Sequence, residues 1–156
     1  MAPLPTLLGH FVRIIPLAGI ILSLAGLGRS VRAQDPGSDS LARREATVFR
    51  ALQHAVAAND REAVAATFVY PFRVNRSPKS FFTVRSRAQL IKSFADVLPD
   101  TIRRAILRQN PDSLFHNWQG TMVGNGEVWI SGVCEDRAAV RCRYGVTAVN
   151  LPGPHP

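Results

Sequence analysis

A pair of β-type runs joined by a short glycine turn constrains this fold more than any other feature of the sequence. The runs are Leu114–Val123 and Glu127–Cys134, and Asn125-Gly126 lies between them. Alternating apolar and polar side chains predict β-strands, and Asn-Gly is typical of a two-residue type I′ hairpin turn. The chain is therefore predicted to contain a long antiparallel hairpin.

The turn fixes the register of this hairpin, because a shift of one residue would move every side chain to the other face. Met122 is expected opposite Trp129, and Trp118 opposite Val133, with His116 further along the same face. The second face is predicted to carry Thr121, Val123, Val128, Ile130 and Cys134.

The two cysteines of the chain, Cys134 and Cys142, lie at the end of this hairpin and at the start of a third β-type run, Cys142–Val149. If the domain lies in an oxidising compartment, an even pair of cysteines favours a disulfide over a metal or redox site. The spacing is not the two-residue gap of a redox motif, and no histidine lies close enough in sequence to complete a zinc set. We therefore expect a disulfide across a second hairpin and no metal.

Helical periodicity dominates the preceding part of the chain. Apolar residues recur at three- and four-residue spacing over Ser40–Asn59, which predicts a long amphipathic helix. Asp60 is expected to cap a short helix over Arg61–Phe68. The segment Phe68–Val74 is rich in aromatic and β-branched residues, but Pro71 lacks a donor, so at best an edge strand is predicted.

A short strand over Phe81–Arg85 and further helical turns complete the expected elements. Ser86 and Gln89 form a capping box ahead of a third helix, which ends at Pro99 and gives way to another short helical segment. The predicted fold class is α+β: N-terminal helices packed on a curved, cone-like antiparallel sheet, with one hairpin closed by a disulfide.

The first 33 residues are predicted to be a secretory signal. They contain three arginines and no acid, a fourteen-residue apolar run over Ile14–Leu27, and the small-x-small exit Val31-Arg32-Ala33. Cleavage after Ala33 would give a mature chain that begins at Gln34, in the periplasm or outside the cell. An uncleaved N-terminal anchor is the alternative, since Arg29 and Arg32 follow the apolar run directly.

The predicted organisation is a signal over 1–33, a linker over 34–40, a single domain over 41–150 and a Pro-rich tail over 151–156. Removal of the signal lowers the formal net charge from +8 to +5. The remaining arginines are scattered in pairs, which is typical of solvated faces. We expect no nucleic-acid partner, and membrane contact only through the transient signal.

Two local motifs resemble those of the nuclear transport factor 2-like, cystatin-like cone-fold domains of small exported bacterial proteins. They are Val69-Tyr70-Pro71-Phe72 and the Gly-x-Met-x-Gly-x-Gly-x-Val-Trp pattern over Gly120–Trp129. The resemblance covers roughly Leu41–Val149. It implies a cavity between the concave sheet face and the helices, in a superfamily that includes isomerases, hydrolases, dehydratases and non-catalytic binding domains.

The cavity implied by this resemblance is expected to be lined by one face of the hairpin and two further aromatic residues. The candidate ligand-binding residues are Tyr70, Phe94, His116, Trp118, Met122 and Trp129. The alternative is that these side chains are simply core. The other sheet face also carries apolar residues and is expected to bind a second copy of the chain, through Thr121, Val128, Ile130 and Val146.

The predicted function is that of an exported, non-catalytic domain that binds a small apolar molecule or an envelope protein. The alternative is a small acid–base enzyme of isomerase, hydrolase or dehydratase type, with His116 as base and Asp96 as the candidate carboxylate partner. A scaffold with a filled cone is a third possibility. No motif indicates a cofactor, and the question of catalysis stays open at this stage.

Overall fold

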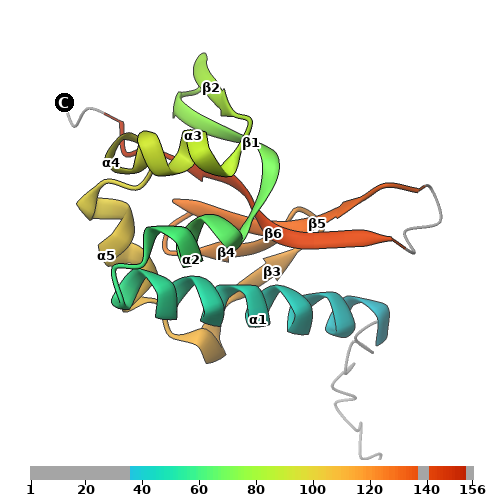
Figure 1. Cartoon of the computed structure of the whole chain (residues 1–156). Coiled ribbons are helices and arrows are strands. Elements are labelled where there is room, and N and C mark those ends of the chain that lie inside the picture. Colours follow the sequence, from blue (N-terminus) through green and yellow to red (C-terminus); the bar gives the residue numbers. More distant parts are fainter. Residues whose placement is uncertain (1–35, 137–140, 154–156) are drawn as a thin grey trace, which may run out of the picture. The chain divides into compact units, whose positions relative to one another are not determined.

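The computed structural model describes residues 36–136 and 141–153, and the signal and cleavage predicted over 1–33 lie outside them (Figure 1). The fold class is α+β, as predicted, with a long N-terminal helix on a six-stranded sheet. The strand order is β2-β1-β6-β5-β4-β3. The elements are α1 (Pro36–Ala57), α2 (Arg61–Ala66), β1 (Phe68–Ser77), β2 (Ser80–Val84), α3 (Arg87–Lys92), α4 (Phe94–Val97), α5 (Asp100–Arg108), η1 (Pro111–Ser113), β3 (Phe115–Asn117), β4 (Gly120–Val123), β5 (Val128–Cys134) and β6 (Cys142–Asn150).

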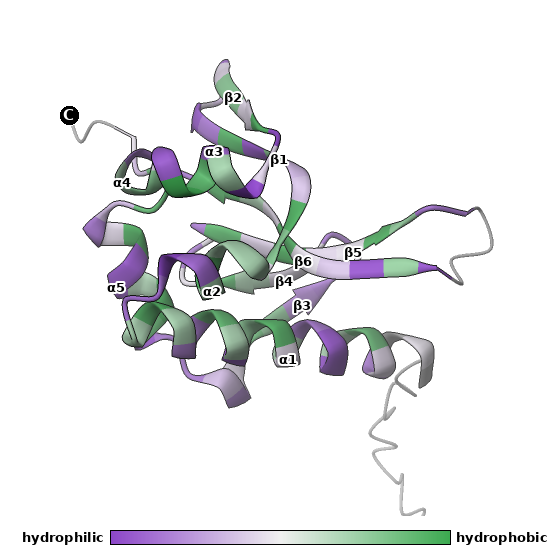
Figure 2. Ribbon diagram, viewed as in Figure 1, coloured by the Kyte–Doolittle hydropathy of each residue, from purple (hydrophilic) through white to green (hydrophobic). Residues whose placement is uncertain are grey.

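Helix α1 is amphipathic and supplies much of the core, and Figure 2 shows apolar and polar segments alternating along it. Phe49 and Leu52 are fully buried. Burial of each such side chain stabilises the fold by about 2–3 kcal/mol. The helix begins at Pro36, earlier than the predicted start at Ser40, so it includes most of the segment predicted as a linker.

The predicted caps of the short helices are confirmed. The Asp60 side chain accepts a hydrogen bond from the Ala63 backbone N–H at 3.0 Å and begins α2. Ser86 accepts from the Gln89 N–H at 3.2 Å, and the Gln89 side chain accepts from the Arg85 N–H at 2.8 Å. The Asp60 and Ser86 contacts each satisfy a backbone donor in the first turn of a helix, and the Gln89 contact holds the residue before the cap.

The position of β1 differs from the prediction of an edge strand, because β1 lies between β2 and β6 and pairs with β6 in parallel. The sheet is consequently mixed rather than wholly antiparallel. Pro71 is tolerated because the register with β6 shifts between Phe68 and Arg73, so Pro71 occupies an interruption of that ladder.

The β4–β5 hairpin has the predicted register, with Met122 opposite Trp129. The predicted type I′ turn is wrong, since it needs a positive φ at both central residues. Here Gly124 and Gly126 have φ values of +66° and +103°, whereas Asn59 is the only non-glycine residue with positive φ in the described ranges. The turn therefore places positive φ at its glycines and not at Asn125.

The predicted strand Leu114–Val123 is interrupted, and the interruption displaces Trp118. Strands β3 and β4 form a tight hairpin in which Asn117 pairs with Gly120. The Asn117 side chain accepts from the Gln119 N–H at 2.8 Å, and Gly120 has a φ of +121°. Trp118 therefore lies at a turn with 91% of its surface exposed, not opposite Val133.

This turn also separates His116 from the other residues predicted to share its face. His116 pairs with Thr121, whereas Phe115 pairs with Met122, so His116 lies on the same face as Thr121. Thr121, Val128, Ile130 and Val146, which were predicted to bind a second copy of the chain, are buried in the core. The prediction that this sheet face is free to bind a second copy is therefore wrong. Met122 and Trp129 lie on the opposite face.

The predicted disulfide is confirmed, and it joins Cys134 and Cys142 at the end of the β5–β6 hairpin. Tyr144 lies opposite Gly132, as expected from the pairing of the cysteines. The disulfide indicates an oxidising compartment outside the cytoplasm. No helix in the described ranges is long and apolar enough to span a bilayer.

Candidate functional site

A cluster of three polar side chains is buried between α1 and the sheet. The Nδ1 atom of His116 lies 2.9 Å from Oε2 of Glu45, and the Thr121 hydroxyl donates to the same oxygen at 2.7 Å. The His116 Nδ1 atom also lies 3.2 Å from the Thr121 hydroxyl oxygen. Glu45 and Thr121 are only 3% and 1% exposed, so these hydrogen bonds replace contacts with water.

The donors and acceptors of the cluster define the tautomer of the neutral imidazole. A carboxylate only accepts, so His116 must carry its proton on Nδ1 to donate to Glu45. The other ring nitrogen, Nε2, then has a free lone pair. Within the described ranges Nε2 forms no hydrogen bond, whereas Nδ1 has two polar neighbours.

The sequence brings the cluster together through helical and strand periodicity. Glu45 lies four residues before Phe49 and seven before Leu52, both fully buried, which places it on the buried face of α1. Thr121 faces the same interior from β4. The β3–β4 hairpin pairs His116 with Thr121 and thereby directs the imidazole toward the helix.

The larger of two cavities beside the cluster, which we call the disulfide-side cavity, has a volume of about 700 Å³. Its wall includes both Glu45 and His116. The rest of the lining comes from the start of α1, the β3–β4 turn and the ends of β5 and β6. These residues are Gly37, Ser40, Leu41, Asn117, Trp118, Gln119, Gly120, Ser131, Gly132, Cys134, Cys142 and Tyr144.

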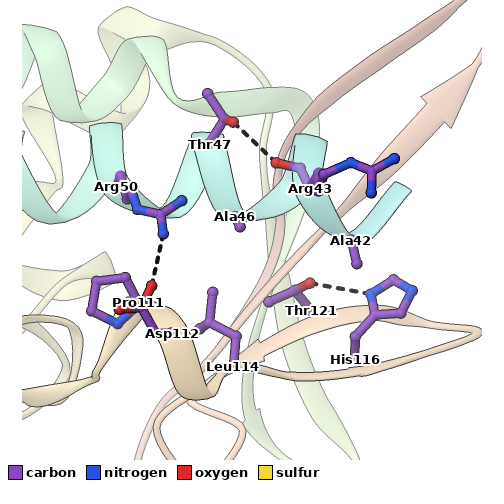
Figure 3. Close-up of a pocket in the computed structure, with 10 residues that line it drawn as sticks. All are labelled: Ala42, Arg43, Ala46, Thr47, Arg50, Pro111, Asp112, Leu114, His116 and Thr121. Atoms are coloured by element: carbon purple, nitrogen blue, oxygen red, sulfur yellow. Dashed lines mark hydrogen bonds and ion pairs between the residues drawn. The ribbon is translucent and has the colours of Figure 1, made fainter. Parts of the chain in front are cut away.

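The second cavity, the loop-side cavity, has a volume of about 440 Å³ and is shown in Figure 3. His116 and Thr121 line it together with the next turns of α1 and the loop around η1. Arg50 and Asp112 form an ion pair at 2.9 Å across one side of it. The His116 side chain therefore borders both cavities, and Glu45 borders the larger one.

The predicted candidate residues are only partly brought together. Asp96 is exposed on α4, and the carboxylate beside His116 is that of Glu45. Phe94 is 4% exposed and belongs to the core, where the Arg61 guanidinium lies 5.1 Å from its ring centre. Of the predicted ligand-binding set, His116 and Trp118 line the disulfide-side cavity.

Tyr70 lies apart from both cavities and has a structural contact. Its hydroxyl donates to the Ala65 carbonyl oxygen at 2.8 Å. Burial raises the pKa of the Tyr70 phenol to about 12; the nearby Arg87 opposes this rise, and Glu62 adds to it. Tyr70 therefore links β1 to the end of α2 by a hydrogen bond and lines neither cavity.

No group of three or more His, Cys, Asp or Glu side chains gathers as a metal site within residues 36–136 and 141–153. Carboxylate, imidazole and hydroxyl groups are chemically able to form hydrogen bonds and to exchange protons. A buried carboxylate that holds one nitrogen of an imidazole leaves the other nitrogen able to accept a proton or a hydrogen bond.

Comparisons with known proteins leave the chain without an assigned family. No family model, no curated protein and no solved structure matches it.

Proposed function

We propose that this chain is an exported domain with the nuclear transport factor 2-like cone fold, and that it binds a small ligand in the disulfide-side cavity. The ligand has an apolar body and one polar group. The observation that carries the proposal is the Glu45–His116 pair in the wall of a cavity of about 700 Å³. Cavities of ligand-binding sites commonly have volumes of about 300–1,000 Å³.

The lining of this cavity suits a ligand with an apolar body and one polar group. Leu41, Trp118 and Tyr144 offer apolar and aromatic surface, and the glycines keep the backbone accessible. The polar side chains of Glu45 and His116 offer an acceptor and a ring nitrogen. A few placed polar groups within apolar walls are typical of sites that orient a small molecule.

The experiment uses N-phenyl-1-naphthylamine, an apolar fluorescent probe with a single N–H donor. The protein is the chain from Gln34 onward, which holds the whole described core between Phe49 and Val149. We expect saturable fluorescence enhancement. Ser40→Phe narrows the cavity and should weaken probe binding at least tenfold, whereas Ala57→Phe, exposed at the other end of α1, should not. Absence of saturation, or equal binding by both variants, would refute the proposal.

The second candidate function is acid–base catalysis in the same cavity, and the hydrogen bond from His116 Nδ1 to Glu45 favours it. A carboxylate that orients an imidazole and stabilises its protonated form is the arrangement of a general base. In this role Nε2 of His116 accepts a proton from the substrate, and Glu45 is a positioning residue.

Carbethoxylation by diethyl pyrocarbonate, followed by peptide mass spectrometry, tests this candidate without a substrate. Glu45→Gln should slow modification of His116 by about fivefold, because a neutral amide stabilises a developing positive charge less than a carboxylate does. The exposed His54 in the same protein is the internal control. An unchanged rate at His116 would exclude the assisted base.

A further inference from the structure

The charged residues of the β1–β2 hairpin and of the helix after it are all basic. Between Ala63 and Ala95 there are six basic residues and no acid. Arg87 pairs with Glu62 of α2 at 2.8 Å. The four bases on or beside the hairpin are exposed and form no ion pair within the described ranges: Arg73, Arg76, Lys79 and Arg85.

Two of these arginines are held in place by aromatic rings. The Arg73 guanidinium lies 3.7 Å from the centre of the Phe81 ring, and that of Arg76 lies 4.6 Å from the Phe82 ring. Stacking restricts the rotamers of a guanidinium while its N–H edges stay available to an oxyanion. Phe81 is itself 54% exposed, so an exposed apolar ring lies beside the Arg73 guanidinium, and the Phe82 ring lies on the other face of the hairpin.

The shape of this region suits an extended partner. The hairpin projects from the domain on the side away from α1 (Figure 1). A hollow of about 620 Å³ runs along β1 to the turn of the hairpin. It is lined by Arg73, Asn75, Arg76, Ser77 and Pro78, with Asn150, Leu151 and Gly153 on its other side. A hairpin that projects in this way can contact a broad surface, but it does not enclose a small molecule.

We propose that the β1–β2 hairpin docks on an anionic phospholipid surface. Arg73 and Arg76 bind lipid phosphates, Lys79 and Arg85 add to the attraction, and Phe81 enters the interfacial layer. Arginine recognises phosphate through paired N–H donors, and aromatic rings partition to the headgroup region. None of these four basic residues lines the disulfide-side cavity, so docking of the hairpin does not depend on the ligand proposed there.

Vesicle co-sedimentation tests the proposal with the chain from Gln34 onward. We expect binding to vesicles of phosphatidylcholine with 30% phosphatidylglycerol, none to pure phosphatidylcholine, and release at high salt. Each basic residue near an anionic surface contributes about a fivefold gain in binding, so Arg73→Gln with Arg76→Gln should weaken it by about 25-fold.

The control removes the same charge elsewhere, through Arg104→Gln with Arg108→Gln, two exposed residues of α5. This control should bind like the unmodified chain. Phe81→Ser should also weaken binding to the charged vesicles at low salt, although it leaves the net charge unchanged. An equal loss in the control would show a net-charge effect and overturn the proposal. Binding to heparin or polyphosphate with none to the charged vesicles would overturn it in favour of a soluble polyanion.

Discussion

Thr121→Val tests whether the buried cluster is held together as the geometry indicates. The substitution preserves shape and strand preference, and it removes the hydroxyl that donates to Glu45 Oε2 at 2.7 Å. A hydrogen bond to a charged group contributes about 1.5–3 kcal/mol. The valine methyl group recovers part of this through apolar burial, at most about 0.8 kcal/mol. We therefore expect the free energy of unfolding to fall by about 1.5 kcal/mol.

The assay is urea denaturation at pH 7 followed by circular dichroism, and the matched control is Thr83→Val. Thr83 lies on β2, and its side chain forms no hydrogen bond within the described ranges. The control should change stability by less than about 0.5 kcal/mol. In a Glu45→Gln background the cost of Thr121→Val should fall by about half, since hydrogen bonds to ionised groups are roughly twice as strong as neutral ones. A Thr121→Val loss as small as that of Thr83→Val would refute the argument.

Three further predictions follow from the core, the disulfide and Tyr70. Leu52→Ala should lower the free energy of unfolding by about 2–5 kcal/mol in urea denaturation, because Leu52 is fully buried; a loss below 1 kcal/mol would contradict its place in the core. Replacing Cys134 and Cys142 by serine should cost about 2.5 kcal/mol, the value that loop-closure entropy gives for a sequence separation of 8, and a loss near zero in the same denaturation would contradict that account. Burial raises the pKa of Tyr70 to about 12, so the contribution of its protonated phenol to stability is fully present below pH 10 and is lost as the pH rises toward 12. Urea denaturation at pH 9 and 11 should show this fall in the free energy of unfolding of the natural chain, and a smaller fall in Tyr70→Phe.

Local patterns predicted much of this fold. The helices, their caps at Asp60 and Ser86, the disulfide and the Met122–Trp129 register all depend on residues close in sequence or directly opposed. The parallel pairing of β1 with β6 depends on tertiary contacts between distant segments. A proline in β1 pointed to an edge, and only the interrupted register explains why it is tolerated.

Only one residue of the Glu45–His116 pair was predicted from the sequence. His116 was identified, but its partner was sought at Asp96, whereas Glu45 lies 71 residues away in sequence. The available signal was a carboxylate at an apolar position of the α1 stripe, midway between Leu41 and Phe49. A carboxylate at a buried helix position needs a hydrogen-bonding partner, because burying an unpaired charge is costly.

Trp118 shows why the face assignment failed. A single uninterrupted strand would give His116 and Met122 the same orientation, whereas a tight turn between them reverses it. The turn is encoded by Asn117, whose side chain accepts from the Gln119 N–H, and by Gly120, whose φ is positive; both residue types are depleted in strands and common in turns.

The central place of β6 has a consequence for how the polypeptide reaches its native state. This strand is formed by the last residues of the domain, yet it lies between β1 and β5 and pairs with both. The β1–β2 hairpin can join the rest of the sheet only after β6 has been synthesised, and such distant pairings slow folding. The sheet is therefore expected to be completed late in folding, when segments far apart in the sequence have come together.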